Sequence, residues 1–548
     1  MKNYDQYKEF FSSMSLSLDF NWRYVYLIAI GLKFVLALSN SYIHPDEHFQ
    51  SFEVLTNKIF SFTTTTPWEF SSDTPARSFG PLYLFYAPLL YSIKLVGYEL
   101  SPLQIWYMAR LQNVLIGWVI TDMCIYRLLP TKPERIKGLF YTSTSYITLV
   151  YQSHCFSNSI ETWLVLICVL VINDLRFIQE SNVPELQSQR QYQKLFWFGA
   201  LVSIGIFNRI TFPAFLALPS LYLMKYFRHN KMSAIFSLLG FMLPTIAIIL
   251  LDTFEFNGSI DDILKHPLDF NSYVITPLNN LIYNSKVENL SNHGLHPYYT
   301  HLLVNLPQIL GPGLFFMVSN FKNQYWKTTP FLAVISGVSV LSLIPHQELR
   351  FLIPIVPLVC CCFDLKNISS ASKGERITKA PPMVSVLMNL WYLFNILLAV
   401  LMGVYHQGGI VPALDYFHSN IFQENSRQSV QIWWRTYSPP PWILGDKLDT
   451  LQVLTVTDDS PQFELDSSKS NYLIDAMGSD YTHVSKLIES FKDFSGSIYL
   501  IAPIASIRKH YDISMHQVWN YTHHLDLDHI DFSDFQSLKP GLGIYELL

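Results

Sequence analysis

Two adjacent carboxylates, Asp46 and Glu47, lie between two histidines in the segment 42–51. A positioned carboxylate can accept a proton from a substrate hydroxyl, which makes this segment a candidate site of acid–base chemistry. Pro45 suits the first position of a helix, whose dipole favours carboxylates in the first turn, so an ordinary helix start is the alternative interpretation. The nearby polar side chains that we expect to bind substrate are His44, His48 and Gln50.

The histidine spacing also raises the question of a metal site. His44, Asp46 and His48 follow one another at intervals of two residues. This spacing fits neither one face of a helix nor a familiar zinc cage, so we predict no metal ligands here.

Further polar clusters interrupt the apolar parts of the chain. Charges within hydrocarbon are costly, so such groups normally line a water-filled cavity or contact a ligand, although helix caps and interfacial anchors are alternatives. A guanidinium pairs well with a phosphate, and a carboxylate can assist proton transfer, a combination that suits glycosyl transfer from a lipid-phosphate sugar. The members that we expect to bind substrate are Arg77, Glu161, Asn208, Arg209, His346, Gln347, Glu348 and Arg350.

The composition indicates which elements must position these residues. Of the 548 residues, 14% are charged and 50% are apolar, against about 25% charged residues in an average soluble protein. This deficit predicts a polytopic α-helical membrane protein. The net charge of −5 gives no reason to expect a nucleic-acid partner, and none of the six cysteines has a CxxC or zinc-like spacing.

The apolar runs predict the membrane topology. Residues 79–97 are apolar but contain two prolines, and we expect them to be embedded without crossing the bilayer. Basic loops between the spans then place the N-terminus in the cytoplasm and the C-terminus in the lumen, with eleven crossings. Candidate glycosylation sites on the lumenal face are Asn257, Asn289 and Asn520. The predicted spans are 24–39, 105–129, 136–152, 158–178, 195–207, 212–227, 232–251, 301–318, 329–344, 349–363 and 383–405.

The chain changes character after residue 405. Short β-like runs appear at 452–456, 472–474 and 497–501, and a helical pattern near 484–491 separates the last two. We therefore predict a multi-span catalytic domain, residues 1–405, with a lumenal loop at 40–78. Residues 406–548 are predicted to form a small lumenal α/β domain.

Several of these segments resemble the signature of the family 22 glycosyltransferases, which are mannosyltransferases of the endoplasmic reticulum that use dolichyl-phosphate mannose. The resemblance covers about residues 20–450. It implies a GT-C-like fold, an endoplasmic-reticulum membrane location, a lumenal active site and no cofactor beyond the lipid-linked donor. The segments that carry it are 44–54, 76–78, 156–162 and 346–351.

Within the family, His44-Pro45-Asp46-Glu47, residues 207–212 and residues 406–409 are most similar to the branch that adds a fourth, α-1,2-linked mannose to the GPI precursor. The third-mannose branch tends to show Asn-Pro-Asp-Glu and Arg-Pro-Thr instead. That branch, and other lipid-linked-oligosaccharide mannosyltransferases of the family, remain the alternatives. A lipid or solute transporter is the rival from another class, but it predicts polar residues across the full membrane depth.

The resemblance implies an inverting reaction from a β-linked donor to an α-linked product. We therefore expect Asp46 to be the general base, with Glu47 either binding acceptor hydroxyls or serving as the base itself. A cation from Arg350, His346 or Arg209 would stabilise the departing dolichyl phosphate, so a metal is not required.

Overall fold

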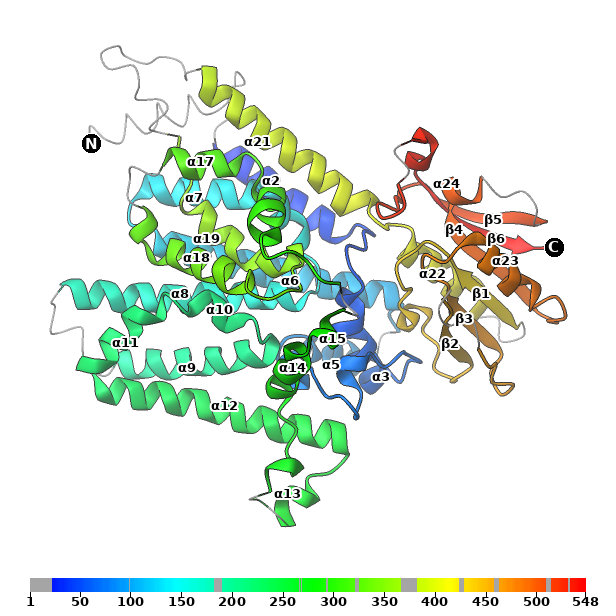
Figure 1. Ribbon diagram of the computed structural model, residues 1–548, viewed down its shortest axis with the longest axis horizontal. Coiled ribbons are helices and arrows are strands. Elements are labelled where there is room, and N and C mark those ends of the chain that lie inside the picture. Colours follow the sequence, from blue (N-terminus) through cyan, green and yellow to red (C-terminus); the bar gives the residue numbers. More distant parts are fainter. Residues whose placement is uncertain are drawn as a thin grey trace. The chain divides into compact units, whose positions relative to one another are not determined.

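The chain forms two compact units whose segments alternate along the sequence (Figure 1). The helical unit comprises the described residues of Met1–Phe34, Trp68–Phe85 and Gln112–Leu397, and the sheet unit comprises those of Val35–Pro67, Tyr86–Leu111 and Leu398–Leu548. The computed structural model describes residues 22–97, 99–181, 190–265, 267, 269–291, 294–320, 325–365, 382–422, 428–457, 463–508, 514–530 and 533–548.

Helices occupy each of the apolar segments that the sequence predicts as spans. Their lengths differ widely, because prolines and polar turns interrupt several of the runs. The principal helices are α2 (Trp22–Ala37), α4 (Phe79–Phe85), α5 (Ala87–Val96), α6 (Pro102–Leu128), α7 (Lys132–Thr144), α8 (Ser157–Ser181), α9 (Arg190–Asn208), α10 (Phe212–Leu216), α11 (Ser220–His229), α12 (Lys231–Asn257), α14 (Thr276–Ser285), α16 (Leu306–Leu310), α17 (Gly313–Ser319), α18 (Thr329–Leu341), α19 (Val356–Cys360) and α21 (Pro382–Val400).

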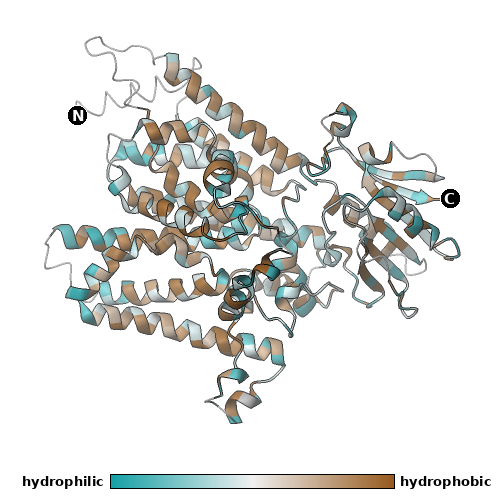
Figure 2. Ribbon diagram, viewed as in Figure 1, coloured by the Kyte–Doolittle hydropathy of each residue, from teal (hydrophilic) through white to brown (hydrophobic). Residues whose placement is uncertain are grey.

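Two helical stretches in the described part of the chain are long and apolar enough to cross a membrane by themselves: Lys231–Asn257 and Pro382–Tyr405. Hydrophobic residues dominate α12 and α21 in Figure 2. Two further pairs of helices are long and apolar enough to cross a membrane only when the two helices of each pair are taken together, and both pairs are bent at a short break. These pairs are Phe79–Phe85 with Ala87–Val96, and His301–Leu310 with Gly313–Ser319. The predicted count of eleven crossings, and the embedded state of 79–97, stay predictions.

Helices α9 and α12 pack backbone against backbone in the helical unit. A Cβ atom added at Gly240 of α12 would lie 1.9 Å from the carbonyl oxygen of Phe196 in α9. One added at Gly199 of α9 would lie 2.0 Å from the carbonyl oxygen of Ser237. Small residues permit this close approach between membrane helices, where van der Waals contact drives association.

The sheet unit contains a six-stranded mixed sheet of order β2-β3-β1-β4-β6-β5. Four neighbouring strands are parallel, whereas β6 pairs antiparallel with both β4 and β5. The sheet fits the small α/β domain predicted for the C-terminal part of the chain, and strands β2, β3 and β4 and helix α23 (Tyr481–Glu489) lie where they were predicted. The other three strands, β1, β5 and β6, were not predicted. The bounds are β1 (Ser429–Trp433), β2 (Leu451–Thr455), β3 (Asn471–Asp475), β4 (Ser497–Pro503), β5 (Met515–Tyr521) and β6 (Leu542–Leu547).

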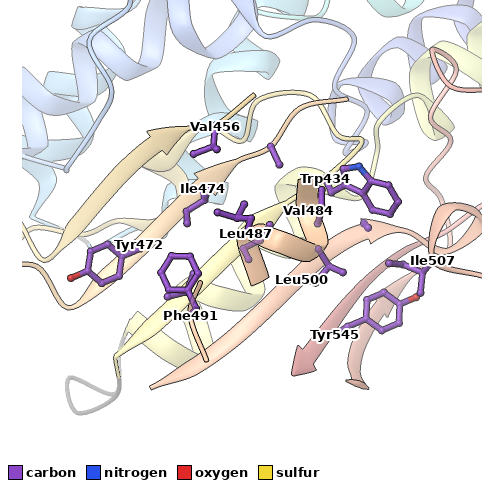
Figure 3. Packing of buried hydrophobic residues seen from close by; sticks show 14 residues of the cluster. Trp434, Val456, Tyr472, Ile474, Val484, Leu487, Phe491, Leu500, Ile507 and Tyr545 are labelled. Carbon is purple, nitrogen blue, oxygen red and sulfur yellow. The ribbon is translucent and has the colours of Figure 1, made fainter. Parts of the chain in front are cut away.

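One face of this sheet is covered by the apolar side of α23. Val484 and Leu487 of the helix pack with Ile474 and Leu500 of the strands, and all four side chains are buried (Figure 3). Each such side chain contributes roughly 1.5–3 kcal/mol when it leaves water. Strands β1 and β3 are buried along their whole length, whereas β2, at the edge of the sheet, is only partly buried.

The sheet unit also takes in two segments from the N-terminal part of the chain. The backbone N–H of Tyr42 donates to the carbonyl oxygen of His406 at 3.0 Å, and the Tyr42 hydroxyl donates to that of Ser438 at 2.9 Å. These bonds join residues that the predicted boundary at 405 and 406 separates. The two compact units therefore have boundaries that differ from those predicted for the domains 1–405 and 406–548.

Candidate active site

Asp46 lies where the chain turns helical after Pro45. The backbone N–H of Asp46 donates to Nδ1 of His44 at 3.2 Å. This imidazole nitrogen of His44 also lies 3.3 Å from Oδ1 of the Asp46 side chain. The Asp46 side chain keeps 19% of its surface exposed. A wide helical turn, the π-helix His48–Phe52, follows directly and leads into α3 (Glu53–Phe60), a geometry frequent at functional sites.

Glu47 has the opposite environment from its neighbour. Its carboxylate is fully buried and accepts two hydrogen bonds from Arg110, one at 2.7 Å and one at 2.6 Å. The same guanidinium donates to the carbonyl oxygens of Ser39 and Ser41, both at 2.8 Å, and stacks on Trp106 at 3.7 Å. The bidentate pair fastens Glu47, directly after Asp46, to α6, and the bonds to the two carbonyl oxygens fasten the segment before Asp46 to the same helix.

His48 and Gln50 are both buried within the sheet unit. The indole N–H of Trp442 donates to Nδ1 of His48 at 3.1 Å, and Tyr42 packs edge-on against the imidazole with ring centroids 5.0 Å apart. These contacts hold the π-helical turn in place. The substrate-binding role expected for His48 and Gln50 stays a prediction.

The predicted polar clusters of the helical unit converge around Ser157 and Glu161 at the start of α8. Arg209 lies 3.1 Å from the buried Glu161 carboxylate and donates to the Ser157 hydroxyl at 2.9 Å. The amide of Asn208 donates to the Ser157 carbonyl oxygen at 2.9 Å. Arg77, held by Glu69 at 2.9 and 3.0 Å, reaches the same hydroxyl at 3.5 Å. Two guanidinium groups thus meet at one serine.

The segment 346–351 lies beside this cluster. His346 contacts Glu348 at 2.8 Å, and Glu348 also accepts a hydrogen bond from Arg350. The guanidinium groups of Arg209 and Arg350 both lie over the Phe351 ring, at 5.1 and 5.8 Å from its centroid. Burial lowers the pKa of His346, but its hydrogen bonds to Glu348 and to the Gly294 carbonyl outweigh burial and raise the pKa.

Gln347 has a different arrangement from its charged neighbours. Its side-chain oxygen accepts from the His301 backbone N–H at 2.8 Å, and its amide donates to the Ser342 and Ile344 carbonyl oxygens at 3.1 Å. Its side-chain amide group therefore ties the 342–347 turn to the start of the π-helix His301–Asn305.

The predicted site residues divide between the two units. Asp46, Glu47 and their neighbours belong to the sheet unit, whereas Arg77, Glu161 and the 208–209 and 346–350 segments belong to the helical unit. In the described part of the chain, no group of three or more His, Cys, Asp or Glu side chains could hold a metal ion.

Two residues of this region were missing from the predicted set. Arg110 is a fully buried cation on an apolar helix, and its position inside a predicted span was the signal that could have found it. Glu53 is buried too, and its carboxyl accepts from the backbone N–H of Thr65 at 3.2 Å and of Trp442 at 3.4 Å. Burial raises the pKa of Glu53 well above its ordinary value.

The fold defines the class of protein. Over 96% of this chain and 98% of that chain, the structure matches ArnT from Cupriavidus metallidurans bound to undecaprenyl phosphate, with a TM-score of 0.52 and 10% sequence identity. The apo structure of the same protein matches with a TM-score of 0.50. The chain therefore has the GT-C fold that these structures show, as the family resemblance implied.

The chain belongs to the Alg9-like mannosyltransferase family, whose model matches residues 24–444. It is 52% identical to GPI mannosyltransferase 4 of Candida albicans, over 97% of this chain and all of that protein. The enzymes of the same name from Saccharomyces cerevisiae and Yarrowia lipolytica are 38% and 37% identical over 97% and 96% of the chain, and 99% of each relative is covered. The resemblance inferred from the sequence motifs is confirmed.

Proposed function

We propose that this protein transfers mannose from dolichyl-phosphate mannose to a GPI precursor, adding the fourth mannose in α-1,2 linkage. The observation that carries the proposal is the 52% identity, along essentially the whole chain, to a protein named GPI mannosyltransferase 4. The ArnT structure with the same fold holds undecaprenyl phosphate, another polyprenyl phosphate, which supports a lipid-linked donor. The location that suits these substrates is the endoplasmic-reticulum membrane, with the reacting groups on the lumenal side.

Asp46 is the proposed general base. Inversion at the sugar carbon requires one displacement, during which the attacking acceptor hydroxyl loses its proton to a positioned carboxylate. Asp46 keeps a partly exposed side chain at the start of a helix, beside His44. Glu47 is fully buried and bound by Arg110, which supports a positioning role for it rather than proton transfer.

The cations of the helical unit are the proposed partners of the departing dolichyl phosphate. Arg209 and Arg350 both stack on Phe351, and each is also held by a carboxylate, Glu161 or Glu348. A guanidinium oriented in this way can stabilise the negative charge that develops on the leaving phosphate. In the proposed displacement, Asp46 accepts the proton of the acceptor hydroxyl, and Arg209 and Arg350 stabilise the departing phosphate.

The test is mannose transfer by the purified protein in detergent. We expect dolichyl-phosphate mannose and a GPI precursor with three mannoses to yield a product one hexose heavier, and an α-1,2-specific mannosidase to remove that hexose. Transfer only to a two-mannose precursor would instead assign the third-mannose activity. No transfer to either precursor, by protein that is folded and bound to donor, would refute the proposal.

A further inference from the structure

The motif His406-Gln407-Gly408-Gly409 has no role in the proposed transfer step, yet it organises part of the sheet unit. Its backbone pairs with the segment 523–525: the N–H of Gln407 donates to the Leu525 carbonyl at 3.1 Å. A Cβ at Gly408 would lie 2.4 Å from the carbonyl oxygen of His523, so this approach requires glycine. The motif therefore fixes the path of the chain through His524, Leu525 and Asp526.

This segment forms one wall of a pocket of about 330 Å³, within the size range of small-molecule sites. The pocket lies wholly in the sheet unit. Its side chains are mainly basic or hydrogen-bonding ones. The polar residues that line it are Arg435, Ser506, His524, Asp526, His529, Ser537 and Lys539.

His524 supplies a buried donor to this pocket. Its side chain is 1% exposed, and the Gly409 N–H donates to Nδ1 at 3.2 Å. Burial lowers the pKa of His524 to about 3 and outweighs the opposing effect of the Asp526 charge, so the ring is neutral. We assign its one proton to Nε2, because Nδ1 accepts. Among the described residues, this buried Nε2 has no hydrogen-bond partner.

Arg435 brings a cation to the pocket on a strained backbone. Its φ of 54° lies in the left-handed region, which costs energy for a residue other than glycine and is concentrated at functional sites. The backbone N–H of Arg435 donates to the Met477 carbonyl at 2.6 Å, which holds this conformation. Its Nε is also buried without a partner among the described residues.

The carboxylate in the pocket has its own partners. Asp526 accepts from His529 Nδ1 at 2.7 Å and from the Gln407 amide at 3.3 Å. The hydrogen bond to Asp526 raises the pKa of His529, which favours the charged imidazolium. Arg435 and Lys539 outnumber the single carboxylate Asp526, so the pocket has an excess of positive charge.

We propose that this pocket binds a phosphate ester of a sugar or polyol. Arg435, Lys539 and the His524 Nε2–H group are the donors for the phosphate oxygens, and Asp526 and the serine hydroxyls suit the hydroxyl groups of the polyol. A bare inorganic anion would use the cations but not the carboxylate. That the ester is part of a GPI-type acceptor rests on the proposed function. That the pocket binds a phosphate ester rests only on the residues that line it.

The experiment uses the purified full-length protein in an uncharged detergent and follows the phosphorus NMR line width of myo-inositol 1-phosphate. We expect broadening by the wild type, and at least a tenfold loss of affinity in Arg435→Gln and in Lys539→Gln. Lys539 is exposed, so its variant tests the site even where Arg435→Gln fails to fold. Lys492→Gln, an exposed lysine paired with Glu489 outside the pocket, should bind normally.

The outcomes separate the possibilities. No broadening by the wild type, or equal binding by both pocket variants and Lys492→Gln, would overturn the proposal. If phosphatidylinositol in nanodiscs reduces binding of the soluble ester relative to phosphatidylcholine, the pocket takes a lipid headgroup; equal binding in both discs identifies a free phosphate ester. Protein that binds the ester but transfers no mannose would refute the proposed function and not the pocket.

Discussion

At the residue scale, two consecutive carboxylates have different surroundings. Asp46 is partly exposed beside His44, whereas Glu47 is fully buried in an ion pair with Arg110. Breaking a buried ion pair costs about 3–5 kcal/mol, because the remaining charge is left uncompensated. Chemistry at Asp46 and anchoring at Glu47 should therefore respond differently to the same isosteric change.

We expect Asp46→Asn to lower mannose transfer by roughly 10²- to 10⁴-fold, as for loss of a general base, with an unchanged thermal midpoint. Glu47→Gln should lower the thermal midpoint together with activity, because Arg110 loses its counter-charge. Radiolabelled mannose transfer and thermal unfolding of both purified variants measure this. The exposed Asp73→Asn serves as the control. An active Asp46→Asn with a stable, inactive Glu47→Gln would make Glu47 the base.

A second residue-scale prediction concerns Asp475 at the end of β3. Burial raises its pKa to about 6, above the ordinary value near 4. The folded protein therefore holds a proton that the unfolded chain releases, so stability falls as pH rises through this window and stays lower above about 6. Asp475→Asn removes the loss, with a gain of roughly 2–3 kcal/mol at pH 8 and little change at pH 4.

Urea unfolding of the wild type and Asp475→Asn at pH 4 and pH 8 measures this effect. The amide can still accept from the Met477 N–H, which donates to Oδ1 of Asp475 at 3.0 Å. Asp493→Asn, at an exposed position, should show no such pH dependence. A gain for Asp475→Asn that is equal at both pH values would contradict the assignment.

At the scale of elements, glycines decide how closely the apolar helices approach. Apolar periodicity alone places α9 and α12 in a helical bundle, but the carbonyl oxygens of Phe196 and Ser237 lie within about van der Waals contact of the opposing glycines. Side chains larger than hydrogen at those positions would meet rigid backbone.

Gly240→Val should destabilise the helical unit by about 1–3 kcal/mol, the usual cost of overpacking. A lower thermal midpoint in detergent is the expected readout. Gly31→Ala in α2 is the matched control, because a Cβ there meets nothing within 4 Å. Equal midpoints for both variants would show that α9 and α12 can separate without cost.

At the scale of the whole molecule, the proposed lumenal active site and the sequons make a joint prediction. In intact microsomes, a membrane-impermeant maleimide should label Lys132→Cys and not Asp46→Cys, which should react only after permeabilisation. Asn257 and Asn520 are exposed, and conversion of either to Gln should remove one glycan from the protein. Labelling of Asp46→Cys in sealed microsomes would place the proposed base in the cytoplasm.

The sequence alone identified the features that depend only on residues close together along the chain. Apolar runs, the strands 452–456, 472–474 and 497–501, and the 44–51 motif were all readable, because helix, strand and motif patterns are local. The same motifs were sufficient for the family. Strand β1 was missed, because it is defined by its long-range pairing with β3 and β4.

The tertiary structure decided which polar groups meet. Glu47 and Arg110 are 63 residues apart, and Gly409 and His524 are 115 apart, so no local pattern couples them. Burial then gives each group its chemistry: it makes Glu47 an anchor and His524 a neutral donor. Composition and spacing set which residues were available, while long-range packing decided their partners, because the free energy of a buried charge depends on what surrounds it.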